Sequence, residues 1–238
     1  MRYFGGKQRI SKELAYFINE RLDTEQPFVD LFCGSCNVVS NIDNNRIRFA
    51  NDLHKELIEM WRYVQCGGEL PDSISEDEYH IIKKHGEPWL KAFVGFGCSY
   101  SGKYWGGYAR GGENRNYCLN AKNSTIRKMK TMGSVVFSNN NYDEFEIPDG
   151  ALVYCDIPYK GTTSYSTGEF DHDKFYDWAR DKKDSGFDII VSEYKENLPL
   201  GWEIVWEKES KKDIRNKDGV QSETKEVLMT PKEFWNAG

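Results

Sequence analysis

The chain of 238 residues lacks the marks of several large protein classes. No apolar run is long enough to cross a bilayer, and the opening MRYFGGKQRI has no signal-peptide hydrophobic region. Its six cysteines show no disulfide-framework spacing, so we interpret them as reduced thiols. These absences predict a cytoplasmic protein without a membrane partner.

Two cofactor signatures are also missing. Cys33 and Cys36 form a C-x-x-C pair, but no second pair or histidine stands at a zinc-site spacing, so we expect no metal. No G-x-G-x-x-G follows the first apolar strand, which disfavours NAD.

Positive charge is outnumbered by negative charge overall but is locally concentrated. The net charge of −6 argues mildly against nucleic-acid binding, yet Glu113 is the only acid between residues 101 and 132. As a cluster, the basic residues of this segment favour DNA, although any single one is more often a solvated surface charge. They are Lys103, Arg110, Arg115, Lys122, Arg127, Lys128 and Lys130.

Apolar periodicity predicts an α/β fold with a doubly wound, mostly parallel Rossmann-like sheet. Amphipathic helices are expected at 11–22, with Ser11 as N-cap, at 53–64, capped by Asn51 or Asp52, and within 170–186. The last two predicted strands resemble an antiparallel hairpin. The strands are expected at 28–32, 46–50, 134–138, 151–155, 187–194, 202–208 and 223–230.

The pattern breaks at Cys66-Gly67-Gly68 and resumes near residue 133. Between these points the sequence reads as helical fragments and a Gly/Tyr-rich loop. We therefore expect one main domain formed by 1–65 and 133–238, interrupted by a helical insert at 66–132.

Three polar signatures fall at the carboxyl ends of predicted strands, where doubly wound sheets bind ligands. One is Phe32-Cys33-Gly34-Ser35, and another is Asp52, close to the ~20-residue spacing of a ribose-binding acid. A tight turn with a helix cap explains these two equally well.

The third signature is Asp156-Ile157-Pro158-Tyr159. Aspartate and proline are common in turns, but a turn does not explain the tyrosine. A carboxylate beside a backbone carbonyl can accept both hydrogens of an exocyclic amino group, and a ring can stack on the base that carries it. This set suits a flipped-out nucleobase.

These motifs resemble those of the Dam-type DNA adenine-N6 methyltransferases, which use S-adenosylmethionine. DIPY resembles their D-P-P-Y, FVDLFCGS their F-x-G-x-G, and RYFGGK at 2–7 their opening Y-x-G-G-K. The motif order also matches, and VSEY at 191–194 and the segment 93–110 are similar to phage and bacterial members. The sequence departs from the pattern at Ile157, in place of a proline, and at Cys36, in place of a glycine.

The resemblance implies roles for individual residues. Lys7 would meet the methionine carboxylate of the cofactor, Phe32 its methionine portion and Asp52 its ribose hydroxyls. Tyr142 would lie near its adenine, with either Asn141 or Asp143 meeting the adenine amino group. The implied cofactor-binding residues are Tyr3, Gly6, Lys7, Asp30, Phe32, Gly34, Ser35, Asp52, Asn141, Tyr142 and Asp156.

Asp156, Ile157, Pro158 and Tyr159 would form the catalytic group, and Tyr104 would join the seven basic residues in contacting DNA. The implied activity is transfer of a methyl group to N6 of adenine in a specific duplex sequence, by base flipping and direct in-line transfer. The resemblance also implies that 1–65 and 133–238 form the catalytic domain and that 66–132 is the DNA target-recognition insert. It places the protein in a bacterial or phage-infected cell, in a restriction–modification setting. The oligomeric state is left open, with a monomer favoured. The alternatives are a catalytically impaired DNA-binding relative and a cytosine-N4 enzyme, although cytosine and glutamine methyltransferases favour Ser or Asn at position 156.

Overall fold

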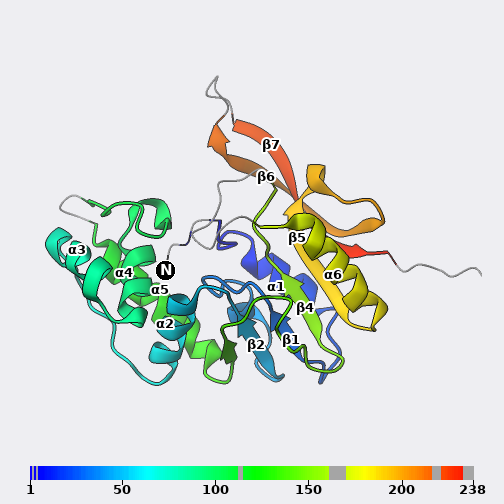
Figure 1. Ribbon diagram of the computed structural model, residues 1–238, viewed down its shortest axis with the longest axis horizontal. Coiled ribbons are helices and arrows are strands. Elements are labelled where there is room, and N and C mark those ends of the chain that lie inside the picture. Colours follow the sequence, from blue (N-terminus) through cyan, green and yellow to red (C-terminus); the bar gives the residue numbers. More distant parts are fainter. Residues whose placement is uncertain (2, 4, 112–114, 161–169, 216–220, 233–238) are drawn as a thin grey trace, which may run out of the picture.

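The computed structural model describes the chain except residues 2, 4, 112–114, 161–169, 216–220 and 233–238, and, within the C-terminal strands, the side chains of 210–224. Its centre is a seven-stranded sheet in the order β3-β2-β1-β4-β5-β7-β6 (Figure 1). The strands are β1 Phe28–Asp30, β2 Arg48–Asn51, β3 Val136–Ser138, β4 Leu152–Cys155, β5 Asp188–Tyr194, β6 Trp202–Arg215 and β7 Gln221–Pro231.

Strands β1 to β5 pair in parallel, and β7 pairs antiparallel with both β5 and β6. The predicted parallel sheet with a C-terminal antiparallel hairpin is therefore confirmed. Because β2 and β4 flank β1 on opposite sides, the direction of winding changes at β1. In such sheets this switch point is where ligands bind, beyond the carboxyl ends of the strands.

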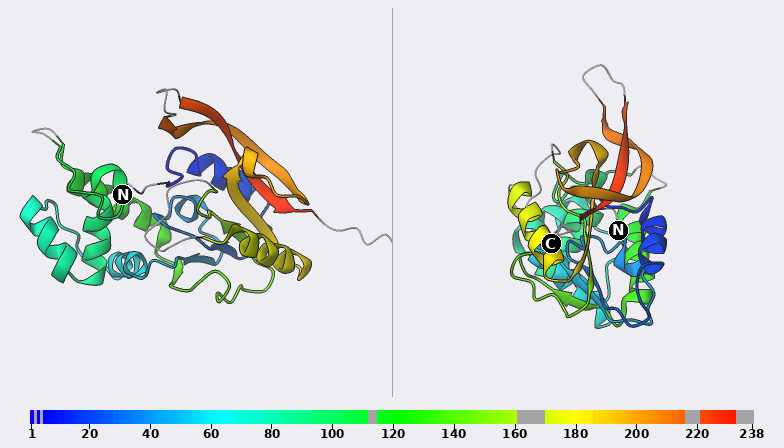
Figure 2. Two further views of the ribbon diagram at one scale, coloured as in Figure 1. Left: turned by 45° about the horizontal axis from the view of Figure 1, so that its top comes forward. Right: turned by 90° about the vertical axis from the view of Figure 1, so that its right-hand side faces the viewer.

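Helices cover both faces of the sheet (Figure 2). Helix α1 (Ser11–Asn19) packs on one face through Leu14, Ala15 and Ile18, which share a core with Phe28 and Leu152. Helix α6 (His172–Asp184) joins a second core that contains the opposite-facing strand residues. Strands β1 and β4 are buried at every position, and their successive side chains point to opposite faces of the sheet. They therefore contribute to two cores, one on each side.

A helical cluster lies at one side of the molecule (Figure 1). The helices are α2 (Lys55–Gln65), α3 (Glu76–His85), α4 (Pro88–Gly97) and α5 (Tyr117–Met132). Phe93 and Val94 of α4 belong to the same core as Leu57 and Trp61 of α2. The predicted insert is therefore packed into the main core; its role in target recognition stays a prediction. Short 3₁₀ turns lie at Val39–Asn41, Tyr100–Gly102 and Lys195–Asn197.

Two predicted helix caps are wrong. Helix α1 begins with Ser11 inside it, because Ile10 takes the cap position and offers no side-chain acceptor. Helix α2 is preceded by His54, so neither Asn51 nor Asp52 is its cap. Asp52 instead accepts the His54 N–H before the helix starts. Among the described residues no helix combines the length and apolarity needed to cross a membrane.

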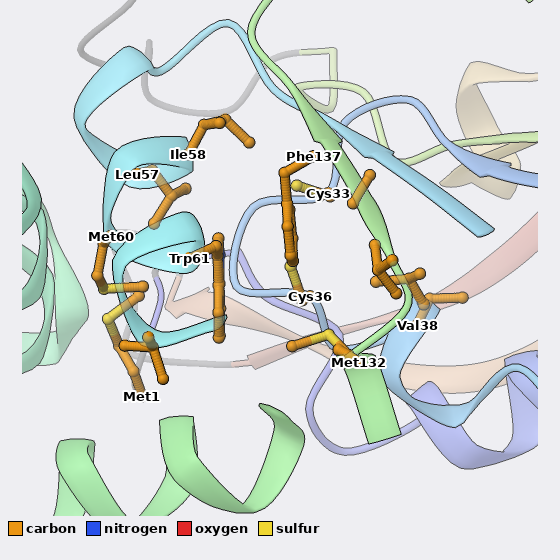
Figure 3. Packing of buried hydrophobic residues seen from close by; sticks show 14 of the residues in the cluster. Met1, Cys33, Cys36, Val38, Leu57, Ile58, Met60, Trp61, Met132 and Phe137 are labelled. Carbon is orange, nitrogen blue, oxygen red and sulfur yellow. The ribbon is translucent and has the colours of Figure 1, made fainter. Parts of the chain in front are cut away.

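Cys36 has an unusual backbone conformation, with a φ of 54°. This left-handed region favours glycine, which is the residue that the resembled motif has at this position. The side chain is fully buried beside Trp61 and Phe137 in the core (Figure 3). Burial of the thiol thus offsets part of the backbone cost.

We expect Cys36→Val to lower the free energy of unfolding by about 2 kcal/mol or more, because a β-branched residue fits the left-handed region poorly. Cys36→Gly should stay within about 1 kcal/mol of the parent, since relief of backbone strain offsets the lost side chain. Denaturant unfolding of both variants measures this difference. Equal stability of the two variants would contradict the strained backbone.

Candidate active site

One cavity of about 450 Å³ lies at the carboxyl ends of β1, β2 and β4. Segments that are far apart in the chain meet there: the GGK stretch, the loop after β1, Asp52, and the segment 140–142. Every residue that the resemblance implies for cofactor binding lines this cavity: Tyr3, Gly6, Lys7, Asp30, Phe32, Gly34, Ser35, Asp52, Asn141, Tyr142 and Asp156. The residues that sequence reasoning missed include Asn37, His54, Phe96 and Lys174.

The loop after β1 is fastened to the end of β2. The N–H of Gly34 donates to Asp52 Oδ2 at 2.8 Å, and the His54 N–H donates to Oδ1 at 2.8 Å. Gly34 has a φ of 47°, and a Cβ there would come within 3.1 Å of the Tyr3 ring. Burial raises the pKa of Asp52, and these two backbone donors offset part of the rise. Each carboxylate oxygen retains a second lone pair that can accept from a ligand.

Asp30 lies at the end of β1 and is 2% exposed. Its Oδ2 accepts the Val39 N–H at 3.3 Å, while Oδ1 has no hydrogen-bond partner among the described residues. Burial raises the pKa of Asp30 well above its usual value, and the neighbouring Asp156 adds to the rise. A cationic group in the cavity would satisfy the unpaired oxygen.

Asp156 follows β4 and forms an ion pair with Lys7, 2.6 Å from Oδ1 to Nζ. Lys7 is 7% exposed and also pairs with Glu226 Oε1 at 3.2 Å. Burial alone would lower the pKa of Lys7, but Asp156 and then Glu226 outweigh it and raise that pKa. Burial raises the pKa of Asp156 to about 6, because Lys7 offsets only part of the desolvation and Glu226 adds to the rise.

The rest of the turn is held by side chains from three other elements. His172 Nε2 bonds the Pro158 carbonyl at 2.7 Å, Tyr159 Oη donates to Glu226 Oε1 at 2.7 Å, and the Lys160 N–H donates to Glu193 Oε2 at 3.1 Å. Ile157 points into the core and is 2% exposed. The turn therefore has external anchors, while Ile157 replaces the first proline of the resembled motif. Pro158 lines the cavity, whereas Tyr159 is half-buried beside it.

Aromatic rings form one wall of the cavity. Phe32 lies 5.8 Å from Tyr142, centroid to centroid, and 5.9 Å from Phe170. Asn141 lines the cavity, while Asp143 forms an ion pair with Lys174 at 2.7 Å and does not line it. Of the two residues that the sequence left open, Asn141 is therefore the one at the cavity.

Seven of the eight predicted DNA contacts divide into three groups. Lys103 and Tyr104 line the cavity, with the Tyr104 hydroxyl bonded to Glu56. Two others form ion pairs within the helical cluster, Arg110 with Glu76 and Lys122 with Asp72. Three are exposed: Arg115, Arg127 and Lys130.

Lys128 is half-buried and has partners within the protein. Its Nζ donates to the Ser35 carbonyl at 2.5 Å and to Asn37 Oδ1 at 2.6 Å. Burial lowers the pKa of Lys128 to about 8. These bonds fasten α5 to the loop after β1, and a contact of Lys128 with DNA stays a prediction. In the described parts of the chain, no group of three or more His, Cys, Asp or Glu is arranged to hold a metal ion.

Comparison with known proteins also relates the chain to DNA adenine methyltransferases. Residues 3–87 match the family described as D12 class N6 adenine-specific DNA methyltransferase. The Type II methyltransferase M.FokI of Planomicrobium okeanokoites is 25% identical over 80% of this chain. The resemblance to the adenine-specific methyltransferases is confirmed. This chain spans 33% of the length of M.FokI.

Solved structures resemble the chain only distantly. Three of them have 11% identity and cover 93% of this chain. HI0767 of Haemophilus influenzae has a TM-score of 0.41 with 88% of its chain covered, and the Thermotoga maritima SAM-dependent O-methyltransferase has 0.39 with 65%. Trm5 of Methanocaldococcus jannaschii has 0.38 with 48%. The fold follows from the strand order of the sheet itself.

Proposed function

We propose that this chain transfers a methyl group from S-adenosylmethionine to the exocyclic N6 nitrogen of adenine in a specific duplex DNA sequence. The observation that supports it best is the meeting of the separate motifs at one cavity, with Asp156 at its lining. The match of residues 3–87 to the D12 class supports the choice of adenine.

The residues of the cavity suit the cofactor. Its volume of about 450 Å³ is typical of sites for molecules of that size. Asp52 offers acceptors for ribose hydroxyls, and the unpaired oxygen of Asp30 suits the ammonium of the methionine part. Lys7 has three N–H donors, of which Asp156 and Glu226 engage two, so one is left for the methionine carboxylate. When bound, the cofactor supplies the methyl group on a sulfonium, which Phe32 would face with its ring.

The adenine amino group needs activation because its lone pair is delocalised into the ring. Asp156 and the carbonyl of Ile157 would accept its two hydrogens, which favours a tetrahedral nitrogen whose lone pair is directed at the methyl carbon. The C–S bond would break as the N–C bond forms, which would leave the cofactor as a neutral thioether, and the methylated nitrogen would then pass one proton to the Asp156 carboxylate. Positioning and electrostatics supply the rate enhancement. Reaching this site requires the base to leave the duplex, and Tyr159 would support the flipped base.

The rate of methyl transfer should fall at low pH. The Asp156 carboxylate accepts only when ionised, and its raised pKa of about 6 places the loss within reach of ordinary buffers. Each pH unit below that value should cost roughly tenfold. A pH–rate profile in single turnover measures it, and a flat profile between pH 5 and 7 would contradict an ionised Asp156 as acceptor.

Binding of DNA should depend on the exposed cations of α5. We expect Arg127→Gln with Lys130→Gln to flatten the slope of log K against log salt by at most about 1.8, since each phosphate that the protein no longer neutralises lowers the slope by about 0.9. Lys83→Gln with Lys84→Gln on α3 is the matched control, because it removes the same charge from an exposed neighbouring helix. Equal slopes in both double variants would place the DNA elsewhere.

Methylation-sensitive sequencing of a host that expresses the chain tests the proposed activity. We expect N6-methyladenine at one short recurring motif. Modified cytosine would indicate the cytosine-N4 alternative. An unmodified genome, together with cofactor binding by the purified protein, would indicate a catalytically impaired relative.

A further inference from the structure

Glu226 is a buried carboxylate that no sequence motif marked. It lies on β7, is 8% exposed, and pairs across the sheet with Tyr194 of β5. Residues paired directly across two strands share a face of the sheet. Glu226 and Tyr194 therefore both face the turn that carries Asp156.

The two residues hold Tyr159 from different sides. Glu226 Oε1 accepts the Tyr159 hydroxyl at 2.7 Å, and the Tyr194 ring meets the Tyr159 ring edge-on at 4.5 Å between centroids. Lys7 Nζ lies 4.2 Å from the centroid of the Tyr159 ring. A hydrogen bond to a charged acceptor is among the stronger ones in proteins, so the hydroxyl fixes the ring by its far end.

The same carboxylate shares the only cation shown beside Asp156 in the described residues. Lys7 Nζ is 2.6 Å from Asp156 and 3.2 Å from Glu226, so two buried carboxylates divide one ammonium. If Glu226 carried no charge, Lys7 would interact with Asp156 more strongly, because the ammonium would no longer be shared. The titratable groups that influence or sense Asp156 come from several elements: Lys7, Asp30, Tyr154, Cys155, Tyr159 and Glu226.

We propose that Glu226 is a positioning residue for methyl transfer: it anchors Tyr159 beneath the target base and limits how far Lys7 neutralises Asp156. The inference rests on the proposed function and adds a residue to its site. Because the Tyr159 hydroxyl donates to Glu226, Tyr159→Phe disrupts the same anchor.

Glu226→Gln removes the charge and keeps the shape. Lys7 should then pair with Asp156 alone, so the apparent pKa of the Asp156 carboxyl should fall. Tyr159→Phe should move that pKa the other way, because Glu226 loses a donor and draws Lys7 towards itself. Carboxyl ¹³C NMR of the full chain without ligand measures both titrations, with the Asp156 signal assigned from its absence in Asp156→Asn.

Glu207→Gln on β6 is the matched control. Glu207 is exposed and pairs with Lys195 and Lys225 outside the cavity, so the same substitution should leave the Asp156 titration unchanged. Opposite shifts in Glu226→Gln and Tyr159→Phe, with none in Glu207→Gln, support the proposal. An Asp156 titration that is unchanged in both site variants overturns it. Should Glu226→Gln fail to fold, the upward shift in Tyr159→Phe decides alone.

Single-turnover rates test the proposal that Glu226 anchors Tyr159. Glu226→Gln and Tyr159→Phe should each slow methyl transfer about tenfold with little change in cofactor affinity, and the double variant should lose much less than the product of the two. Wild-type rates in Glu226→Gln, or fully multiplicative losses, overturn the anchor. If the unmodified chain transfers nothing to adenine, the proposed function fails, while the NMR titrations still decide the charge-sharing between Glu226 and Asp156.

Discussion

Replacing Asp156 with alanine should reduce the rate of methyl transfer at least a hundredfold while cofactor affinity changes little. The variant loses one of two acceptors for the adenine amino group at the stage when the nitrogen becomes nucleophilic. Losing such an interaction costs about 3 kcal/mol or more in the transition state. Single-turnover transfer from labelled cofactor to duplex DNA measures the rate, and calorimetry measures the affinity.

Asp156→Asn is the companion variant, since the amide keeps the shape but presents an N–H where an acceptor is needed. Lys7 keeps Glu226 as a partner in both variants, so the fold should survive. Near-normal turnover in Asp156→Ala would contradict the mechanism. A matching loss of cofactor affinity would assign Asp156 to cofactor binding instead of the transfer step.

Asp52→Ala should weaken cofactor binding about a hundredfold. The carboxylate both fastens Gly34 and would accept the ribose hydroxyls, and hydrogen bonds to charged groups contribute about 1.5–3 kcal/mol each. Titration calorimetry with S-adenosylmethionine measures the affinity directly, without DNA.

Asp184→Ala, at the exposed end of α6, removes the same charge away from the cavity and should bind the cofactor normally. Unchanged affinity in Asp52→Ala would return Asp52 to the structural role in the turn that the sequence left open. Since Asp52 also holds the loop after β1, thermal unfolding of the unliganded variant should accompany the titration.

Much of the parallel part of the fold could be predicted because its strands are short, largely apolar and bounded by turn residues, whereas β6 (Trp202–Arg215) continues through a charged stretch beyond the predicted end at 208. The lining of the cavity could also be predicted, because the carboxyl ends of parallel strands meet at one edge of the sheet. The predicted helix caps were wrong because apolar periodicity does not define the residue at which a helix begins. Ser11 is already helical, and His54 is the residue that precedes α2.

The anchors of the Asp156 turn could not be predicted from local pattern. Glu226 is 67 positions from Tyr159 in the chain, and Glu193 is 33 positions from Lys160, so only tertiary packing brings them together. The internal partners of Lys128 could not be predicted for the same reason, since a helical lysine carries no sequence sign of the groups that it will contact. Its contacts with Ser35 and Asn37 span 93 and 91 positions.

The most direct test of the account is the identity of the methylated nucleoside. The purified chain is incubated with methyl-labelled S-adenosylmethionine and duplex DNA of random sequence, the DNA is digested to nucleosides, and the labelled species is identified. The account predicts label in N6-methyladenine, and at least a hundredfold less of it at matched early times in Asp156→Ala. Label in a cytosine nucleoside, or label that persists undiminished in Asp156→Ala, would contradict it.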